Sequence, residues 1–145
     1  MVYLFLADGF EEIEALTPVD LLRRAGVEVV TVGVTGKTVT GSHGIAVSAD
    51  VSADEALAML KGGKSPEMIV LPGGMPGAAT LDGSSVVDTF IDAAEKANAY
   101  IAAICAAPMI LGKRGLLCGR QATCFPGFEE YLAGATYMDV HTVQK

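Results

Sequence analysis

The residue best suited to chemistry in this chain is Cys105, which follows the apolar segment 100–104. Its surroundings, Ala103-Ile-Cys-Ala-Ala107, contain small residues on both sides. A nucleophile on a strained turn between a strand and a helix needs small neighbours, because bulky ones would clash. The glycines of the usual G-x-S-x-G pattern are alanines here, so the pattern is only partly met. N–H groups at a helix N-terminus would favour the thiolate. A buried structural cysteine is the alternative for this segment taken alone.

A second candidate feature is the glycine pair Gly73 and Gly74, which ends the segment Val70-Leu-Pro-Gly-Gly74. Glycines allow backbone N–H groups to approach and bind an oxyanion. An ordinary tight connection between a strand and a helix would have the same sequence. In a parallel sheet, both this turn and Cys105 would lie at the carboxyl edge, where ligands bind.

Acidic residues follow the first apolar segment at Glu11, Glu12 and Glu14. Helical spacing assigns the apolar residues within 13–22 to one side of a helix. On this assignment Glu11 and Glu12 face solvent, whereas Glu14 is best placed to reach inward. The alternative is that these carboxylates complement the helix dipole on a solvated face.

Short apolar segments alternate with amphipathic ones along the chain, which is typical of an α/β protein with a mostly parallel sheet. The segments are uniformly apolar, as in strands that helices cover on both faces. The predicted strands are Val2–Leu6, Val27–Val34, Met68–Leu71, Tyr100–Cys105 and Gln121–Phe125, with a short hairpin before residue 52.

Helix boundaries are also predictable. Asp8 is expected to cap the first helix, which Pro18 would kink or divide in two. Ser52-Ala-Asp-Glu55 matches a capping box. The predicted helices are Glu11–Gly26, a short one over 56–60 and Ser85–Asn98, and an extended pair around Met138-Asp139 is expected within Thr136–Val143.

Composition excludes several classes of protein. With 51% hydrophobic residues the chain is not disordered, and its length fits one domain over residues 1–145. A pI near 4.7 argues against nucleic acid and anionic membranes as partners, since both need a basic face. The uncharged stretch 97–112 is too short to span a bilayer, and the N-terminus lacks a basic signal region. We therefore expect a cytoplasmic protein.

The three cysteines, Cys105, Cys118 and Cys124, cannot all pair with one another, which favours free thiols in a reducing compartment. No C-x-x-C spacing occurs, and the histidines are His43 and His141. The sequence therefore predicts no metal site of the structural zinc type.

Four segments together resemble the ThiJ/PfpI family, in the branch of the human Parkinson-disease protein and its bacterial relatives. They occur in family order and span most of the chain. The resemblance implies a flavodoxin-like three-layer sandwich that forms homodimers and needs no cofactor. The matching segments are Glu11-Glu-Ile-Glu14, residues 18–26, Val70-Leu-Pro-Gly-Gly74 and Ala102-Ala-Ile-Cys-Ala-Ala-Pro108.

The same resemblance implies the site. Cys105 is then the reactive cysteine, and Glu14 is the acidic partner that hydrogen-bonds its sulfur. The anion hole falls on backbone N–H groups of the Gly73-Gly74 turn and of Ala106. The implied stress-response activities are glyoxalase conversion of methylglyoxal to lactate and deglycase repair of glycation adducts, so the substrate is a small aldehyde or a glycated molecule. The alternative is a non-catalytic redox sensor or chaperone that uses the same cysteine.

Physical chemistry restricts how this pair works. A thiolate and a carboxylate in contact cannot both be charged at low cost, so the pair should share one proton. We expect a neutral Glu14 that acts as acid and base while the Cys105 thiolate attacks the aldehyde. The oxyanion would face the Gly74 and Ala106 N–H groups, and proton movement from C1 to C2 would give lactate. A thiolate of low pKa would also be oxidised by peroxide to sulfinic acid.

Some positions depart from the family pattern. Protease-like members have a histidine where this chain has Ala106, and the human-type branch has one at the position of Phe125. These differences argue against amidase or peptidase activity. Thiamine-precursor metabolism, the role that gave ThiJ its name, lacks support because no phosphate-binding loop is present.

Further residues align with the dimer contact of the family. His43 aligns with an arginine that reaches the partner subunit's site, although it could equally be a loop histidine without a role. Arg24 matches an arginine near the dimer contact. Cys118 and Cys124 are interpreted as packing residues. Family members continue beyond Lys145 with another strand and helices, so we interpret Lys145 as a cleavage point or chain end. A second chain would then carry the missing segment.

Overall fold

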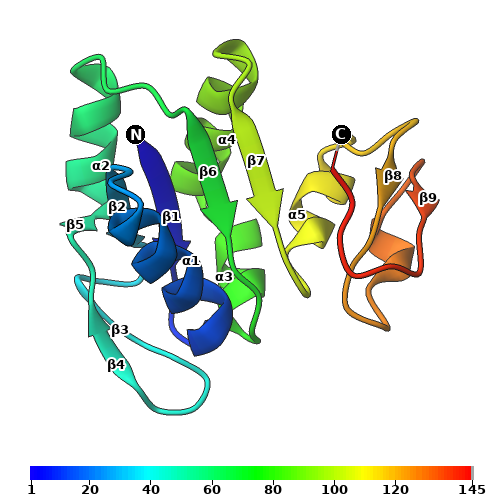
Figure 1. Ribbon diagram of the computed structural model, residues 1–145, viewed down its shortest axis with the longest axis horizontal. Coiled ribbons are helices and arrows are strands. Elements are labelled where there is room, and N and C mark those ends of the chain that lie inside the picture. Colours follow the sequence, from blue (N-terminus) through cyan, green and yellow to red (C-terminus); the bar gives the residue numbers. More distant parts are fainter. Residues whose placement is uncertain (145) are drawn as a thin grey trace.

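A parallel five-stranded sheet forms the centre of the computed structural model, which describes residues 1–144 (Figure 1). Its strand order is β5-β2-β1-β6-β7, and every neighbouring pair is parallel. Strand β1 is buried along its whole length, as its uniformly apolar sequence predicts. The α/β class with a mostly parallel sheet is thereby confirmed. The strands are β1 (Val2–Leu6), β2 (Val29–Gly33), β5 (Val51–Ser52), β6 (Met68–Leu71) and β7 (Tyr100–Ala103).

The two faces of the sheet are covered differently. Figure 1 shows α1 in front of the sheet and α3 and α4 behind it. The larger core lies on the rear face, where Phe90 packs 4.7 Å from Tyr3 and 5.1 Å from Phe5 between ring centroids. The front face carries α1 and the predicted hairpin. The elements concerned are α1 (Glu12–Arg24), α2 (Ala53–Lys61), α3 (Gly77–Asp82), α4 (Ser85–Lys96), α5 (Pro108–Lys113), β3 (Thr38–Thr40) and β4 (Ala46–Ser48).

The start of α1 differs from the prediction. Glu11 is the N-cap, and its carboxylate accepts a hydrogen bond of 2.9 Å from Glu14 N–H. Asp8 instead accepts from Thr40 N–H at 2.8 Å, which ties β3 to the end of β1. Pro18 lies inside one continuous helix. The capping box of Ser52 and Glu55 at the start of α2 is confirmed, as is the predicted helix α4.

The buried side of α1 also differs from the prediction. Glu12, Ala15 and Val19 are buried, whereas Ile13 is 72% exposed and Leu21 is 59% exposed. The predicted solvent position of Glu12 is therefore wrong. The physical reason is that the turn between β3 and β4 supplies hydrogen-bond donors to the Glu12 carboxylate. These hydrogen bonds offset the free-energy cost of burying it.

The C-terminal part forms a small sheet of its own on the far side of α5 from β7 (Figure 1). Strand β8 (Gln121–Ala122) pairs in parallel with β9 (Thr136–Tyr137), and the 3-10 helix η1 (Glu129–Tyr131) lies between them in sequence. The predicted strand Gln121–Phe125 is thus shorter, and the extended pair around Met138-Asp139 is wrong. The predicted cleavage at Lys145 lies outside the described residues.

None of the helices within residues 1–144 combines the length and the hydropathy that crossing a membrane would require.

Candidate active site

Cys105 lies on a tight turn at the carboxyl edge of the sheet. Strand β7 ends at Ala103 and α5 begins at Pro108, so the predicted strand end and helix start at the cysteine are both shifted. Ala107 N–H donates to Ile104 C=O at 3.0 Å and closes the turn around Cys105. The φ of Cys105 is +61°, a left-handed conformation that a non-glycine residue adopts only under strain.

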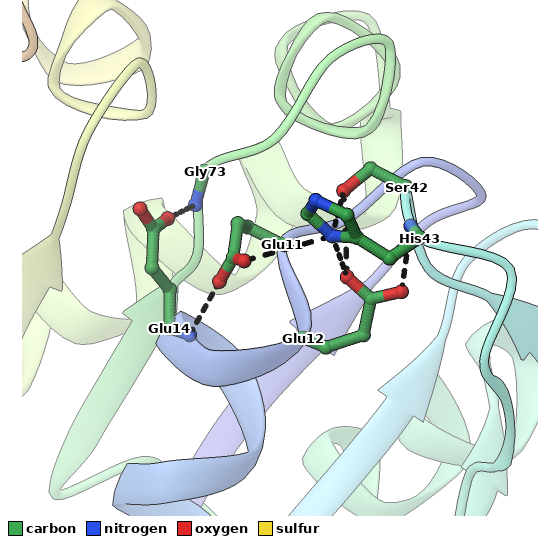
Figure 2. Close-up of polar contacts among 6 residues, drawn as sticks. All are labelled: Glu11, Glu12, Glu14, Ser42, His43 and Gly73. Carbon is green, nitrogen blue, oxygen red and sulfur yellow. Dashed lines mark hydrogen bonds and ion pairs between the residues drawn. The ribbon is translucent and has the colours of Figure 1, made fainter.

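Glu14 reaches the same corner from the first turn of α1. Its Oε2 accepts a hydrogen bond of 2.8 Å from Gly73 N–H (Figure 2). The Glu14 carboxyl group and the Cys105 thiol face the same point of the turn, since a Cβ atom on Gly73 would lie 2.6 Å from Glu14 Oε2 and 3.0 Å from Cys105 Sγ. The backbone N–H groups of Gly74 and Ala106 lower the pKa of the Cys105 thiol, as expected of donors near the sulfur. The structure therefore brings together the five residues of the predicted centre.

The glycine turn makes this close approach possible. A Cβ atom on Gly73 would lie 2.5 Å from Cys105 Cβ and 2.6 Å from Glu14 Oε2. Gly74 has a φ of +88°, and a Cβ atom there would lie 2.4 Å from Glu11 N. Only glycine fits these two positions, because any side chain would displace the thiol, the carboxylate or the start of α1.

The protonation of the pair follows from burial and charge. Burial and then the Glu14 carboxylate raise the pKa of Cys105, and the N–H groups of Gly74 and Ala106 offset part of that rise. Burial raises the pKa of Glu14 against the hydrogen bond from Gly73. Both raised pKa values mean that the thiol and the carboxyl group resist being charged at the same time, which agrees with one shared proton. The prediction of a thiol with a low pKa is wrong, since the sulfur is half-buried beside an acid.

A second polar cluster lies beside the first (Figure 2). The Glu12 side chain is only 6% exposed. Its Oε1 accepts a hydrogen bond of 2.8 Å from His43 N–H, and its Oε2 lies 2.8 Å from His43 Nδ1, with which it is also hydrogen-bonded. A Cβ atom on Gly41 would lie 2.2 Å from Glu12 Oε1, so the glycine leaves room for the carboxylate. Ser42 Oγ contacts the same pair. The predicted candidate His43 is thus held by Glu12 of the same chain.

Charge in this cluster is strongly coupled. Burial alone would raise the pKa of Glu12. The hydrogen bonds from the side chain and backbone of His43 outweigh this effect and lower the pKa of Glu12 to about 2. The hydrogen bond and charge of Glu12 raise the pKa of His43. Among residues 1–144, Glu11, Glu12 and His43 are the set that could hold a metal ion, with ligand atoms within 4.8 Å of one another.

The other candidates differ in how near they lie to the Cys105 corner. Arg24 is at the far end of α1, where its Nε donates to Asp20 at 2.9 Å. Phe125, at the position of the family histidine, has a side chain that is 56% exposed. Cys118 is exposed, whereas Cys124 is half-buried near the site.

Sequence reasoning missed Glu12 as a member of the site region. The spacing of Glu12, Ala15 and Val19 follows one helical face and could have indicated its burial. The hydrogen-bonding partners on the β3–β4 turn had no comparable signal, because nothing in the sequence placed that turn next to α1.

Comparisons with known proteins agree with this fold. The DJ-1/PfpI family model matches residues 1–145. Dj-1beta of Drosophila melanogaster is 36% identical over 143 residues, which cover 97% of this chain and 73% of that protein. The Parkinson disease protein 7 homolog of Danio rerio is 37% identical, over 91% of this chain and 69% of that protein. A protein of Pyrococcus abyssi named deglycase is 30% identical, over 98% of this chain and 83% of that protein.

A solved structure has the same architecture. A variant of a DJ-1 superfamily protein from Salmonella typhimurium superimposes with a TM-score of 0.89 at 32% identity. The match covers 99% of this chain and 76% of that chain. The predicted flavodoxin-like sandwich is confirmed by this likeness.

Proposed function

The chain belongs to the DJ-1/PfpI family, as its resemblance predicted, and on that basis we propose a cofactor-independent enzyme of glyoxalase or deglycase type. Its substrates would be 2-oxoaldehydes or glycation adducts. The deglycase name of the Pyrococcus abyssi relative supports this class. The observation that carries the proposal is the corner in which the Cys105 thiol, the Glu14 carboxyl group and two backbone N–H groups meet.

The reaction would begin with proton transfer inside the pair. Moving the thiol proton to Glu14 leaves a thiolate beside a neutral acid, so the site gains no net charge and the repulsion that raises the pKa of Cys105 disappears. The thiolate then attacks the aldehyde carbon of methylglyoxal. The hemithioacetal oxyanion would accept hydrogen bonds from Gly74 and Ala106 N–H.

Glu14 would next return its proton to the oxyanion, which gives the neutral hemithioacetal and a Glu14 carboxylate. The carboxylate then removes the C1 proton and delivers it to C2, while the proton of the C1 hydroxyl group moves to the C2 oxygen, which gives a lactoyl thioester on Cys105. Water hydrolyses the thioester, releases lactate and restores the thiol. Overall, methylglyoxal and one water give lactate and one proton, without oxidant or reductant.

A second copy of the chain is the proposed partner. An apolar groove of about 440 Å³ lies between α1 and strands β6 and β7, with Ile13, Leu21 and Ile104 among its lining residues. These side chains are 72%, 59% and 48% exposed, as is typical of a surface that binds another protein. Glu14 lines the same groove, so a homodimer formed there would cover the approach to the site.

Two further expectations belong to the proposal. Three free cysteines support the predicted reducing compartment, which we propose is the cytoplasm. The second chain expected to carry a C-terminal segment stays a prediction.

The test is lactate formation from methylglyoxal by the full chain. Wild type should form lactate, Cys105→Ser should form none above the buffer rate, and Cys118→Ser should match wild type because that exposed thiol lies outside the corner. Equal rates for wild type and Cys105→Ser would contradict the proposal. No lactate from wild type, together with clean oxidation of Cys105 by peroxide, would favour the redox sensor instead.

A further inference from the structure

A second cysteine lies on the segment that packs against Cys105. Phe125 N–H donates a hydrogen bond of 2.8 Å to the Cys105 carbonyl oxygen. The peptide group that links Cys124 to Phe125 is therefore hydrogen-bonded to the peptide group that links Cys105 to Ala106. Both cysteines are half-buried, free thiols, and both line one cavity between β7 and the C-terminal unit. The two residues are 19 positions apart in sequence, and this contact makes them neighbours.

This hydrogen bond fixes how far apart the two cysteines can be. Standard peptide dimensions, with one hydrogen bond joining the two units, place the Cα atoms about 5–6 Å apart. A disulfide spans Cα separations of roughly 4.4–6.8 Å. Cys124 follows β8 and precedes η1, on a segment without helix or strand. Small backbone adjustments at Cys124 that let the two sulfur atoms meet would therefore break no hydrogen bonds of a helix or a sheet.

We propose that Cys124 is the resolving cysteine of Cys105, so that peroxide converts the two thiols into an intrachain disulfide. The proposal deepens the proposed function, because it rests on the reactivity of the Cys105 sulfur. The Cys105 thiolate attacks one peroxide oxygen, the O–O bond breaks, and water leaves after taking up a proton. Cys105 is then a sulfenic acid.

The second step removes that oxygen. The Cys124 sulfur attacks the Cys105 sulfur, the S–O bond breaks, and the hydroxyl group leaves as water with the Cys124 proton. One peroxide is reduced to two waters while two thiols are oxidised to one disulfide. The reaction competes with a second peroxide, which would oxidise the sulfenic acid irreversibly to sulfinic acid.

Electrostatics favours the resolving step once oxidation has begun. Burial and the Glu129 carboxylate raise the pKa of Cys124, and ionised Cys105 adds to that rise. A sulfenic acid at Cys105 is neutral, so its formation removes this last contribution. Cys124 therefore ionises more readily at the stage at which its thiolate is needed.

Cys118 is the matched control for this proposal. It is exposed and packs against Gly134, where a Cβ atom would lie 3.0 Å from its sulfur. No backbone hydrogen bond joins its segment to Cys105 among the described residues. Cys118 thus shares the chemistry of Cys124 without its position.

The experiment treats the reduced full chain with increasing hydrogen peroxide, blocks the remaining thiols by alkylation and analyses intact and digested protein by mass spectrometry. Wild type should lose two hydrogens and yield a peptide pair cross-linked between Cys105 and Cys124. Cys118→Ser should give the same product. Cys124→Ser should give no disulfide and accumulate sulfinic acid at Cys105, and Cys124→Ala guards against an effect of folding in the serine variant.

The proposal is overturned if wild type proceeds to sulfinic acid without a disulfide at any peroxide ratio. A cross-link from Cys105 to Cys118, or a disulfide that survives in both Cys124 variants, would overturn it as well. Lactate formation by the reduced wild type is measured without peroxide. A failure of the glyoxalase proposal is therefore seen separately from a failure of the disulfide.

Discussion

Glu14 influences the pKa of Cys105 chiefly through its charge. Because the Glu14 carboxylate contributes to the raised pKa of Cys105, Glu14→Gln should lower that pKa. The thiolate fraction, followed by ultraviolet absorbance against pH, and the rate of alkylation should both increase. Lactate formation should nevertheless fall by about 10²–10⁴-fold, because glutamine cannot transfer protons.

The opposite signs of these two effects make the test specific. Glu95→Gln is the control, since Glu95 is an exposed carboxylate in the last turn of α4, which precedes the opposite end of β7. It should change neither quantity. An unchanged Cys105 titration in Glu14→Gln would show that the carboxylate does not govern the thiol.

The Glu12–His43 pair predicts a pH dependence of stability. His43 has a raised pKa, so its contribution is complete below its ordinary value of 6.5 and is lost as pH rises through the higher folded value. Glu12 has a pKa lowered from 4.5 to about 2, so its contribution is complete above 4.5 and is lost as pH falls towards 2. The pair should stabilise the fold most between pH 4.5 and 6.5.

The measurement is the free energy of unfolding in urea at a series of pH values. His43→Asn should be destabilised relative to wild type within that window, and the difference should shrink at alkaline pH. His141→Asn is the control, because His141 is exposed and lies in the C-terminal tail. A difference that stays constant with pH would contradict ionic coupling to Glu12.

The positions of single residues were predictable where neighbouring residues in the sequence determine them. Small neighbours placed Cys105 on a tight turn, and helical position placed Glu14 inward. The pKa direction of Cys105 was not predictable, since it depends on burial that only the packed structure defines. Glu12 was assigned to solvent because the apolar residues of α1 were taken as its buried side, whereas Ile13 is exposed.

At the scale of elements, the glycine turn after β6 decides whether the corner can form. Gly73→Ala should displace Cys105 or Glu14, because its Cβ would lie 2.5 Å and 2.6 Å from their atoms. We expect a loss of lactate formation and a destabilisation of about 1–3 kcal/mol from overpacking. Alkylation kinetics of Cys105 and urea unfolding measure the two effects.

Gly83→Ala provides the comparison. Gly83 caps α3, and an added Cβ would meet its nearest atoms at 3.8 Å and 3.9 Å, which is ordinary contact. This variant should retain both stability and activity. Equal behaviour of the two variants would mean that the site tolerates a side chain at Gly73.

Elements were predictable where their sequence is long and regular. Strands β1 and β6 have the predicted bounds, and the amphipathic pattern of α4 gave its buried stripe. Strands β8 and β9 have two residues each, and such short segments lack a pattern that would reveal parallel pairing. The short helix α3 was missed because glycine and proline at its start resemble a loop.

At the scale of the whole molecule, the exposed apolar groove predicts self-association. Ile13→Glu should shift the chain from dimer to monomer in sedimentation velocity, because a carboxylate would be buried at the contact. Val140→Glu alters an apolar side chain of 48% exposure outside that groove and should leave the mass unchanged. Identical sedimentation of both variants and wild type would exclude this surface as the dimer contact.

The left-handed backbone at Cys105 also has a consequence for evolution. A side chain at a φ of +61° is strained by about 1–2 kcal/mol, which glycine would avoid and asparagine would tolerate better. In a lineage that no longer needs the thiol, genetic drift would therefore favour one of those two residues. Natural selection for chemistry and selection for a relaxed backbone oppose each other at this single codon.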